Sequence, residues 1–486
     1  MLAKKVARNA LYNSSAILVR NISGIVITIF LARALGHVNF GIYSLTISIA
    51  LLLLSLTDFG INQTVIRYVS DALGKNNILL VRGYAQELGK IKFVLTVIVS
   101  VSLFLLSDVL STSVFHKPTL SLPLKIISGF TLFYPISGFL IGVFNGFNDF
   151  KANFVQSVTY EFFRAATIIA LVSLGYSVTG AIFGFVVASL ASLLSLTIML
   201  LKKYKTYVIG KAEKIDIWRV LKFTGYLTVG GIAWTVFAYV DSVMIGMFMP
   251  AEYVGYYRAS YTVIGAVAGI LSLPAVLFPV FVQLEGRDLK NAFNRVFKYS
   301  AMLAVPASFG LPIISKEIVL TVYGPEYLPA VPVFWILSFL ILRSAVGFWG
   351  VIFNAKEMPE YPVKVAFAGM ILNVVLNYLL IPEFGIVGAA TATMVSNAVV
   401  WSVLAYLSKI HFDVFFTPSH LLKPIAASLV MVAFLSMFSP RSILDGVLMV
   451  FIGAMVYFVV LYAIRGVRRG DVEFLLEILK NKINKK

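Results

Sequence analysis

The sequence predicts an all-α polytopic membrane protein with about fourteen transmembrane helices: two parallel six-helix repeats around a central cavity, plus two C-terminal helices. Three observations lead to this fold class. The 486 residues are 59% hydrophobic and 13% charged, with a mean hydropathy of +0.92, whereas soluble domains are about a quarter charged. Apolar runs of spanning length recur along the chain, and two stretches of sequence occur twice.

A spanning helix needs roughly 20 mostly apolar residues. Fourteen segments meet this requirement: 14–35, 39–60, 91–108, 122–146, 153–174, 178–201, 224–249, 254–282, 298–314, 329–353, 363–381, 386–408, 420–438 and 444–464. The third, ninth and thirteenth are the weakest, because they are short or interrupted by proline. The first is interpreted as an uncleaved span rather than a signal peptide, since its apolar run is long and contains Arg20.

The distribution of positive charge predicts the orientation. With the N-terminus inside, 31 Lys and Arg residues fall on the cytoplasmic side and six on the outer side, and the loop 202–222 alone holds seven. An excess of Lys and Arg is typical of the cytoplasmic loops of membrane proteins. Both termini are therefore predicted to be cytoplasmic. Because orientation explains the pI of about 9.7, no nucleic-acid partner is expected.

An internal duplication predicts the domain organisation. The stretch Gly36–Asp71 resembles Pro250–Glu285, which lies 214 residues further on, and both contain a Gly-x-Tyr motif. Two further matches have offsets of 208–209 residues: Phe144-Asn145 with Phe353-Asn354, and Ser177–Ala181 with Gly385–Ala389. Repeats at such offsets indicate a duplicated half, and six helices per copy would relate the halves by an axis along the membrane normal. The predicted parts are an N-terminal six-helix lobe (1–208), a C-terminal six-helix lobe (209–410), two extra helices (411–464) and a basic cytoplasmic tail (465–486).

Several kinds of chemistry find no support in the sequence. It has no cysteine and no phosphate-binding GxxxxGK[ST] loop. Its four histidines are scattered at loops (His37, His116, His411 and His420). No metal site, no catalytic residue and no organic cofactor are therefore predicted.

Charged residues at membrane depth are the candidate functional residues, because each costs about 3 kcal/mol to insert and usually faces a cavity or a partner. The candidates are Arg20, Glu161, Arg164, Asp241 and Arg343 within spans, and Arg33, Asp58 and Arg258 at span ends. Glu161 and Arg164 lie three residues apart on one helical face, so either a structural pair or a functional site is consistent with them. Arg20 and Arg343 have no partner nearby in the sequence, which favours a functional role.

The remaining candidates have alternative interpretations. Arg33 and Arg258 either extend to the outer interface or line the mouth of the cavity. Asp58 is more typical of a helix end than of a site, and Asp241 could pair with Arg20 or with Arg343. The deepest groups are three arginines against two carboxylates, and a cationic cavity suits a phosphate-bearing anion. A group of tyrosines around 224–282 is interpreted as an interfacial belt rather than as a sugar-stacking surface (Tyr226, Tyr239, Tyr253, Tyr256, Tyr257 and Tyr261).

Two stretches resemble a known family. Residues 33–67, RALGHVNFGIYSLTISIALLLLSLTDFGINQTVIR, resemble the opening of prokaryotic polysaccharide-transport flippases, and Phe384–Ser396, FGIVGAATATMVS, resembles the stretch after their eleventh helix. These flippases belong to the multidrug/oligosaccharidyl-lipid/polysaccharide exporter (MOP) superfamily. Length, span count and duplication agree with the resemblance over nearly the whole chain.

The resemblance implies a flippase of the prokaryotic cytoplasmic membrane, which moves a polyprenyl-(pyro)phosphate-linked oligosaccharide outward by alternating access for polysaccharide or glycan biosynthesis. Family members use cavity arginines on the anionic lipid head, a role that Arg20, Arg343 and Arg164 could fill here. Coupling to H⁺ or Na⁺ would need a carboxylate such as Asp241 or Glu161. Expected partners are membrane lipids, the lipid-linked oligosaccharide and glycan-assembly proteins. The alternatives are a cation-coupled multidrug exporter of the same superfamily and a membrane glycan polymerase or ligase.

Overall fold

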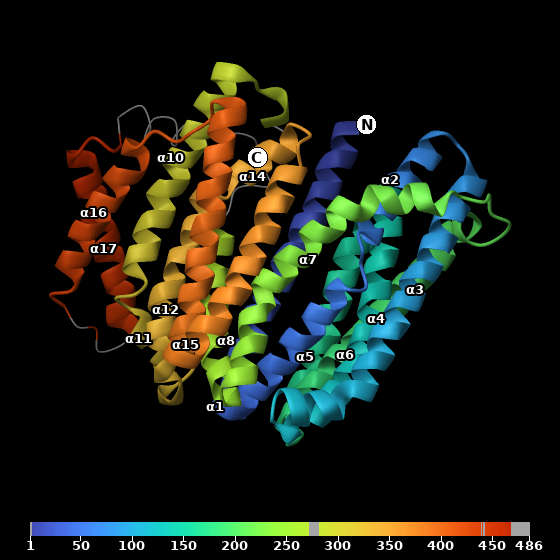
Figure 1. The fold of residues 1–486 in the computed structure, drawn as a ribbon, viewed down its shortest axis with the longest axis horizontal. Coiled ribbons are helices and arrows are strands. Elements are labelled where there is room, and N and C mark those ends of the chain that lie inside the picture. Colours follow the sequence, from blue (N-terminus) through green and yellow to red (C-terminus); the bar gives the residue numbers. More distant parts are fainter. Residues whose placement is uncertain (1, 272–280, 439, 441–442, 468–486) are drawn as a thin grey trace. The chain divides into compact units, whose positions relative to one another are not determined.

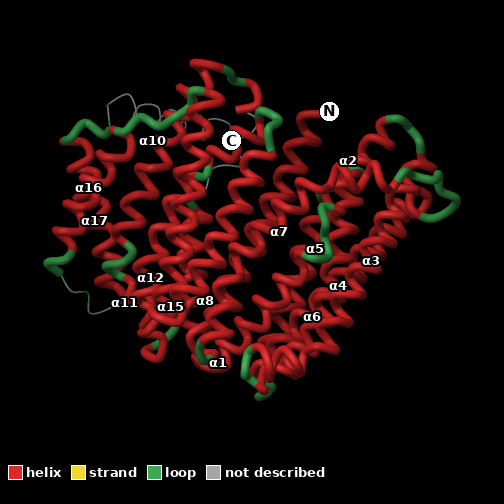
Figure 2. Tube along the Cα trace, viewed as in Figure 1, coloured by secondary structure: helices red, strands yellow, loops and turns green. Residues whose placement is uncertain are grey.

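A computed structural model describes residues 2–271, 281–438, 440 and 443–467. Those residues form helices joined by short turns, and no strand occurs among them (Figures 1 and 2). The α-helices are α1 (Leu2–Ser55), α2 (Ile61–Gly74), α3 (Ile78–Val109), α4 (Ser121–Gly146), α5 (Lys151–Ser173), α6 (Ser177–Val208), α7 (Ile217–Phe248), α8 (Ala251–Ile270), α10 (Gly286–Gly310), α11 (Ser315–Val322), α12 (Val331–Leu337), α13 (Arg343–Val346), α14 (Phe348–Ala355), α15 (Glu360–Phe412), α16 (Ser419–Leu435) and α17 (Ile443–Ala463).

The multi-span helical fold is confirmed. By length and composition, eight helices of the described chain can cross a membrane, and nine if the bent pair α10–α11 forms one span. Two of the eight each cover most of two expected spans: α1 turns at Gly36, with φ 71° and ψ 170°, and α15 turns at Gly385, with φ 59° and ψ −139°. Glycine tolerates these backbone angles because it has no Cβ. The count of fourteen stays a prediction.

The chain forms two compact units. The first consists of residues 1–259 and 363–393, and the second of residues 260–362 and 394–486. The six-helix lobes expected from the duplication stay a prediction. Of the expected basic tail 465–486, all but the first three residues lie outside the described residues.

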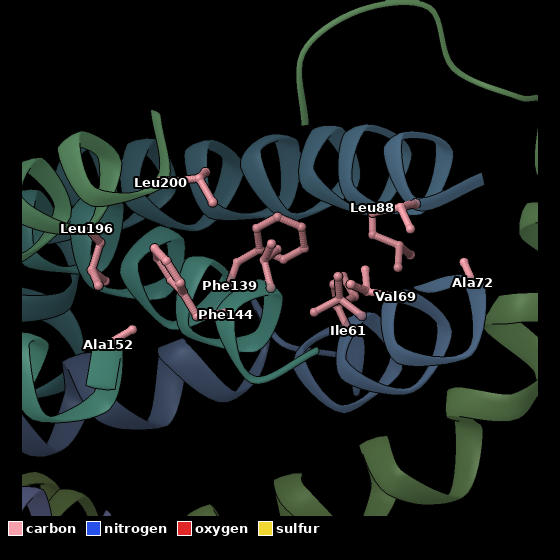
Figure 3. Close-up of a cluster of buried hydrophobic side chains, with 12 residues drawn as sticks. Ile61, Val69, Ala72, Leu88, Phe139, Phe144, Ala152, Leu196 and Leu200 are labelled. Carbon is pink, nitrogen blue, oxygen red and sulfur yellow. The ribbon is translucent and has the colours of Figure 1, made fainter. Parts of the chain in front are cut away.

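The core of the first unit lies between α2, α3, α4 and α6. Apolar side chains from these helices and from the start of α5 form one buried cluster (Figure 3). The polar stretch 61–90 is part of it: α2 buries one face, with Ile61, Val65 and Val69 fully buried, and its opposite face is polar. Such a one-sided helix covers a core rather than crossing a membrane.

The second unit has its own core, in which α10, α16 and α17 pack together. Met302, Met431, Met449 and Tyr457 are buried there, and the Tyr457 hydroxyl donates to the Met302 carbonyl at 3.0 Å. These helices and Val267 of α8 surround an apolar cavity of about 350 Å³. Methionine side chains, which adapt to irregular gaps, are typical of such a lining.

One pair of repeated motifs folds in the same way in the two copies. After Phe144-Asn145, Asn148 has φ 57°, and the amides of Asn148 and Asp149 donate to Asn145 and Phe144. After Phe353-Asn354, Glu357 has φ 58°, and Glu357 and Met358 donate to the corresponding carbonyls. Both are Schellman caps, in which a left-handed residue closes the helix end. The two copies are therefore alike in local backbone conformation as well as in sequence.

A second repeated pair behaves alike. Ser177 has φ 46°, and its counterpart 208 residues on, Gly385, has φ 59°. Three residues later, each copy has a glycine in a tight contact: a Cβ on Gly180 would lie 2.9 Å from the Leu171 side chain, and one on Gly388 would lie 2.2 Å from the Leu380 carbonyl oxygen. Real Cβ atoms essentially never come within 3.0 Å of another heavy atom. These glycines allow the turn between two helices to close.

Candidate functional site

Glu161 and Arg164 form a buried ion pair in the first unit. Their carboxylate and guanidinium groups are 2.6 Å apart, and the side chains are 4% and 13% exposed. The guanidinium carbon also lies 5.6 Å from the ring centroid of Tyr160 and 5.3 Å from that of Phe185. An arginine placed between aromatic rings keeps its charge and donors while being shielded from water. The Nε of Arg164 has no hydrogen-bond partner among the described residues.

Other candidates gather around this pair. The charges of Arg164, Glu161 and Arg258 all act on the hydroxyl of Tyr43, which is buried in α1. Arg258 on α8 also lies over the ring of Tyr239, 5.2 Å from its centroid, and donates to the Ala238 carbonyl at 3.4 Å.

Arg20 belongs to the same group. Its side chain on α1 is exposed, and its charge acts on both Tyr134 and Glu161. The first unit therefore brings three predicted arginines, Arg20, Arg164 and Arg258, to one polar region with a single predicted carboxylate. We call these four residues the arginine group.

Three other predicted residues are not members of the arginine group. Arg343 belongs to the second unit, where it begins α13 with an exposed side chain. Arg33 is exposed on α1, three residues before the turn at Gly36. Asp58 lies in the turn after α1 and pairs with Lys92, whose Nζ is 3.0 Å from the carboxylate and whose side chain is 2% exposed. The Asp58 carboxylate also accepts a hydrogen bond from the backbone N–H of Asn62 at 3.3 Å, which is typical of a helix start.

Asp241 lies in a second polar cluster, also within the first unit. Its carboxylate accepts hydrogen bonds from the Tyr257 hydroxyl at 2.6 Å, the Asn377 amide at 2.6 Å and the Thr393 hydroxyl. Asn373, one turn before Asn377 on α15, donates to the Thr393 hydroxyl at 3.5 Å. We call these five residues the Asp241 cluster. The carboxylate is 2% exposed, and the hydrogen bonds described for it come from neutral groups rather than from an arginine.

Two acceptor oxygens in the Asp241 cluster are orphaned. The side-chain oxygens of Asn373 and Asn377 are buried, and neither has a hydrogen-bond partner in the described part of the chain. Buried polar atoms of this kind are rare and call for an explanation such as an ion. Among residues 2–271, 281–438, 440 and 443–467, no three histidine, aspartate or glutamate side chains are placed to hold a metal ion. A cation at Asp241 would therefore depend on neutral oxygen ligands.

Sequence reasoning missed four members of the Asp241 cluster. Tyr257 was assigned to the interfacial belt, but it is 1% exposed and donates to Asp241. Asn373 and Asn377 carried a usable signal, since two asparagines one helical turn apart inside an apolar span face the same side. Thr393 carried none, because threonine is common in spanning helices and often bonds to its own backbone.

Residues 6–285 match the family described as polysaccharide biosynthesis protein. An uncharacterized membrane protein of Methanocaldococcus jannaschii is 24% identical over 405 residues, which cover 77% of this chain and 78% of that protein. A probable low-salt glycan biosynthesis flippase of Haloferax volcanii is 26% identical over 272 residues, which cover 54% of this chain and 57% of that protein.

Solved structures show the same fold. A lipid II flippase MurJ in an inward closed conformation aligns with a TM-score of 0.75 at 16% identity, over 93% of this chain and 98% of that one. An inward-facing multidrug resistance MATE family transporter of the MOP superfamily aligns with a TM-score of 0.66 at 13% identity, over 81% of this chain and 96% of that one. The chain belongs to the polysaccharide biosynthesis protein family.

Proposed function

We propose that the chain flips a polyprenyl-(pyro)phosphate-linked oligosaccharide across the cytoplasmic membrane by alternating access. The arginine group is the observation that carries this proposal: Arg20, Arg164 and Arg258 outnumber Glu161, and their charges reach the buried hydroxyls of Tyr43 and Tyr134. Guanidinium groups bind phosphate oxygens through paired hydrogen bonds and stay charged. The names of relatives, among them a glycan biosynthesis flippase, support the choice of a glycan-bearing lipid.

Arg20 is the best residue for a test, because its exposed side chain can be removed without leaving a buried charge. Charge-assisted hydrogen bonds contribute about 1.5–3 kcal/mol each, so Arg20→Ala should lower substrate affinity about tenfold or more. Arg20→Lys should recover part of it, since lysine keeps the charge but loses the planar fork. Arg67→Ala is the matched control: it removes an exposed arginine from α2, outside the arginine group.

Flipping is measured in proteoliposomes, as the access of a lipid-linked oligosaccharide to a glycosidase added outside. Equal transport by wild type, Arg20→Ala and Arg67→Ala would remove the arginine group from the mechanism. Efflux of an organic cation such as ethidium, measured in the same vesicles, tests the drug-exporter alternative. A net positive region disfavours a cationic substrate, so no efflux is expected.

The Asp241 cluster supports coupling to a cation gradient, with H⁺ or Na⁺ as the ion. A half-turn of the Asn377 side-chain amide would exchange its two ends, so that its orphaned oxygen rather than its NH₂ group faces Asp241. The Thr393 and Tyr257 oxygens lie at the other oxygen of the Asp241 carboxylate. That set offers one charge and several neutral oxygens, which suits a monovalent cation. A proton on Asp241 would serve the same purpose, because buried carboxylates in spans act as relays.

Asp241→Asn tests the coupling. In vesicles with an imposed Na⁺ or pH gradient, wild-type flipping should follow one of the two gradients, and Asp241→Asn should be insensitive to both. Asp71→Asn is the control, since Asp71 is an exposed carboxylate on α2 that pairs with Lys75 at 2.7 Å. Retention of full gradient dependence by Asp241→Asn would reject the assignment.

A further inference from the structure

A polar pocket lies at the end of the first unit where the chain begins, away from the arginine group and the Asp241 cluster. Its volume is about 440 Å³. The first turns of α1, the turn between α4 and α5, and the end of α6 line it, with the residues Arg8, Asn9, Tyr12, Phe147, Asn148, Asp149, Lys151, Lys203 and Tyr204. We call it the α1–α6 end pocket.

The charges of the pocket are unbalanced. Three cations, Arg8, Lys151 and Lys203, line it with one carboxylate, Asp149. Asp149 is 11% exposed and already engaged: Lys203 donates to it at 2.6 Å and the Tyr204 hydroxyl at 3.2 Å. Within the described ranges, neither Arg8 nor Lys151 has a carboxylate partner. Two positive charges are thus left over beside a half-open pocket.

The walls of the pocket are fixed by packing. The rings of Phe147 and Tyr204 stack with their centroids 4.2 Å apart and their planes 7° from parallel. Both rings pack against the buried cluster of the first unit, and the Tyr204 ring centroid lies 5.8 Å from that of Phe144. On the other side, the Asn9 amide donates to the Asn148 carbonyl at 3.3 Å, which ties the start of α1 to the α4–α5 turn. A cavity held from two sides is a preformed site rather than a gap between mobile side chains.

We propose that the α1–α6 end pocket binds a phosphate group. Arg8 and Lys151 supply the uncompensated charge that an anion needs, and Asp149 holds Lys203 in position at the rim. The stacked aromatic wall offers a surface for the carbon part of a ligand. The pocket lies at a helix end, on the side predicted to be cytoplasmic, where lipid head groups would meet it. The phosphate comes either from an anionic lipid or from a soluble (pyro)phosphate, and the inference does not depend on what is transported.

A set of four single variants tests the site. Arg8→Gln and Lys151→Gln each remove one pocket cation. Lys202→Gln and Lys205→Gln remove exposed cations from the same end of α6 that do not line the pocket. All four lower the net charge equally, so a general attraction of anions to a basic face affects them alike. Gel filtration confirms that each variant is folded.

Binding is measured on the purified protein with two probes: phosphatidylglycerol against phosphatidylcholine by native mass spectrometry, and inorganic pyrophosphate by calorimetry. Each pocket cation should contribute about fivefold in affinity. A loss in Arg8→Gln and Lys151→Gln but not in the two controls supports the site, and the probe that shows the loss identifies the source of the phosphate. Equal losses in all four variants, or binding of neither probe, would overturn the proposal.

Discussion

The two copies of the Gly-x-Tyr motif meet at their glycines, and this contact gives the sharpest prediction. Within the first unit, a Cβ on Gly41 of α1 would lie 1.9 Å from the Ala251 carbonyl oxygen at the start of α8. A Cβ on Gly255 of α8 would lie 2.8 Å from the His37 carbonyl oxygen and 3.2 Å from the Gly41 nitrogen. The helices approach so closely because neither residue has a side chain.

Gly41→Ala should therefore destabilise the protein strongly. The obstacle is a backbone carbonyl, which cannot rotate away as the end of a side chain can. The helices must separate by roughly 1 Å to accept the methyl group, so the cost falls at the upper end of the range for overpacking, about 3 kcal/mol. Gly255→Ala meets a longer contact and should cost about 1 kcal/mol. The order of the two variants follows from the distances alone.

Gly24→Ala is the control, because Gly24 lies on the same helix and a Cβ there would have no atom within 4 Å. Alanine is a better helix former than glycine, so this variant should gain about 0.5–1 kcal/mol. Thermal unfolding of the purified protein in detergent should rank Gly41→Ala lowest, Gly255→Ala next, and Gly24→Ala at or above wild type. A Gly41→Ala protein as stable as Gly24→Ala would refute the close contact.

Three other predictions follow from local geometry. Asp58→Ala should lower the free energy of unfolding by about 3 kcal/mol, because it leaves the buried Lys92 without a counter-charge, and adding Lys92→Met should restore most of it in chemical denaturation. Glu357→Gly should raise the thermal midpoint by relieving the left-handed φ of 58°, a gain of about 1 kcal/mol. Glu360→Gly should lower it, because it removes the acidic side chain from the first turn of α15. A cysteine placed at Lys211 in this cysteine-free chain should resist an impermeant thiol reagent in intact cells, and labelling there would reverse the predicted orientation.

The fold class could be predicted because hydropathy over twenty residues is a local property, and most described residues of the expected spans are helical. The breaks within helices were harder. The span limits near Gly36 and Gly385 were found from their sequence, yet the helices continue through both glycines with a change of direction. The polar stretch 61–90 gave no apolar signal for spanning, and whether such a stretch forms a loop or a surface helix depends on the core that it covers.

The charged site residues could be found because the cost of burying a charge restricts them to few positions. Their partners could not, since packing between distant helices decides which groups meet. From the sequence, Asp241 could pair with Arg20 or with Arg343, whereas the hydrogen bonds that the structure describes for it come from Tyr257, Asn377 and Thr393. Neutral polar residues cost little free energy to place in a membrane span. Their presence in a single sequence therefore does not indicate a functional site.

The duplicated tyrosines have the same backbone position in the two copies and different surroundings. Tyr43 and Tyr257 occupy the same position of the Gly-x-Tyr motif, two residues after the glycines that touch. Both are buried, and each hydroxyl lies in a polar cluster: Tyr43 is under the charges of Arg164 and Glu161, and Tyr257 donates to Asp241. The close contact between the two glycines determines how the two helices pack. In each copy, this packing places the tyrosine two positions after the glycine in the protein interior. The neighbours then differ in sign, with a positive surplus around Tyr43 and a lone carboxylate beside Tyr257. Under the proposed function, a duplication that kept this backbone arrangement and changed only the surrounding charges would give one copy an anion-binding role and the other a cation-binding role, as an ion-coupled carrier of an anionic lipid would need.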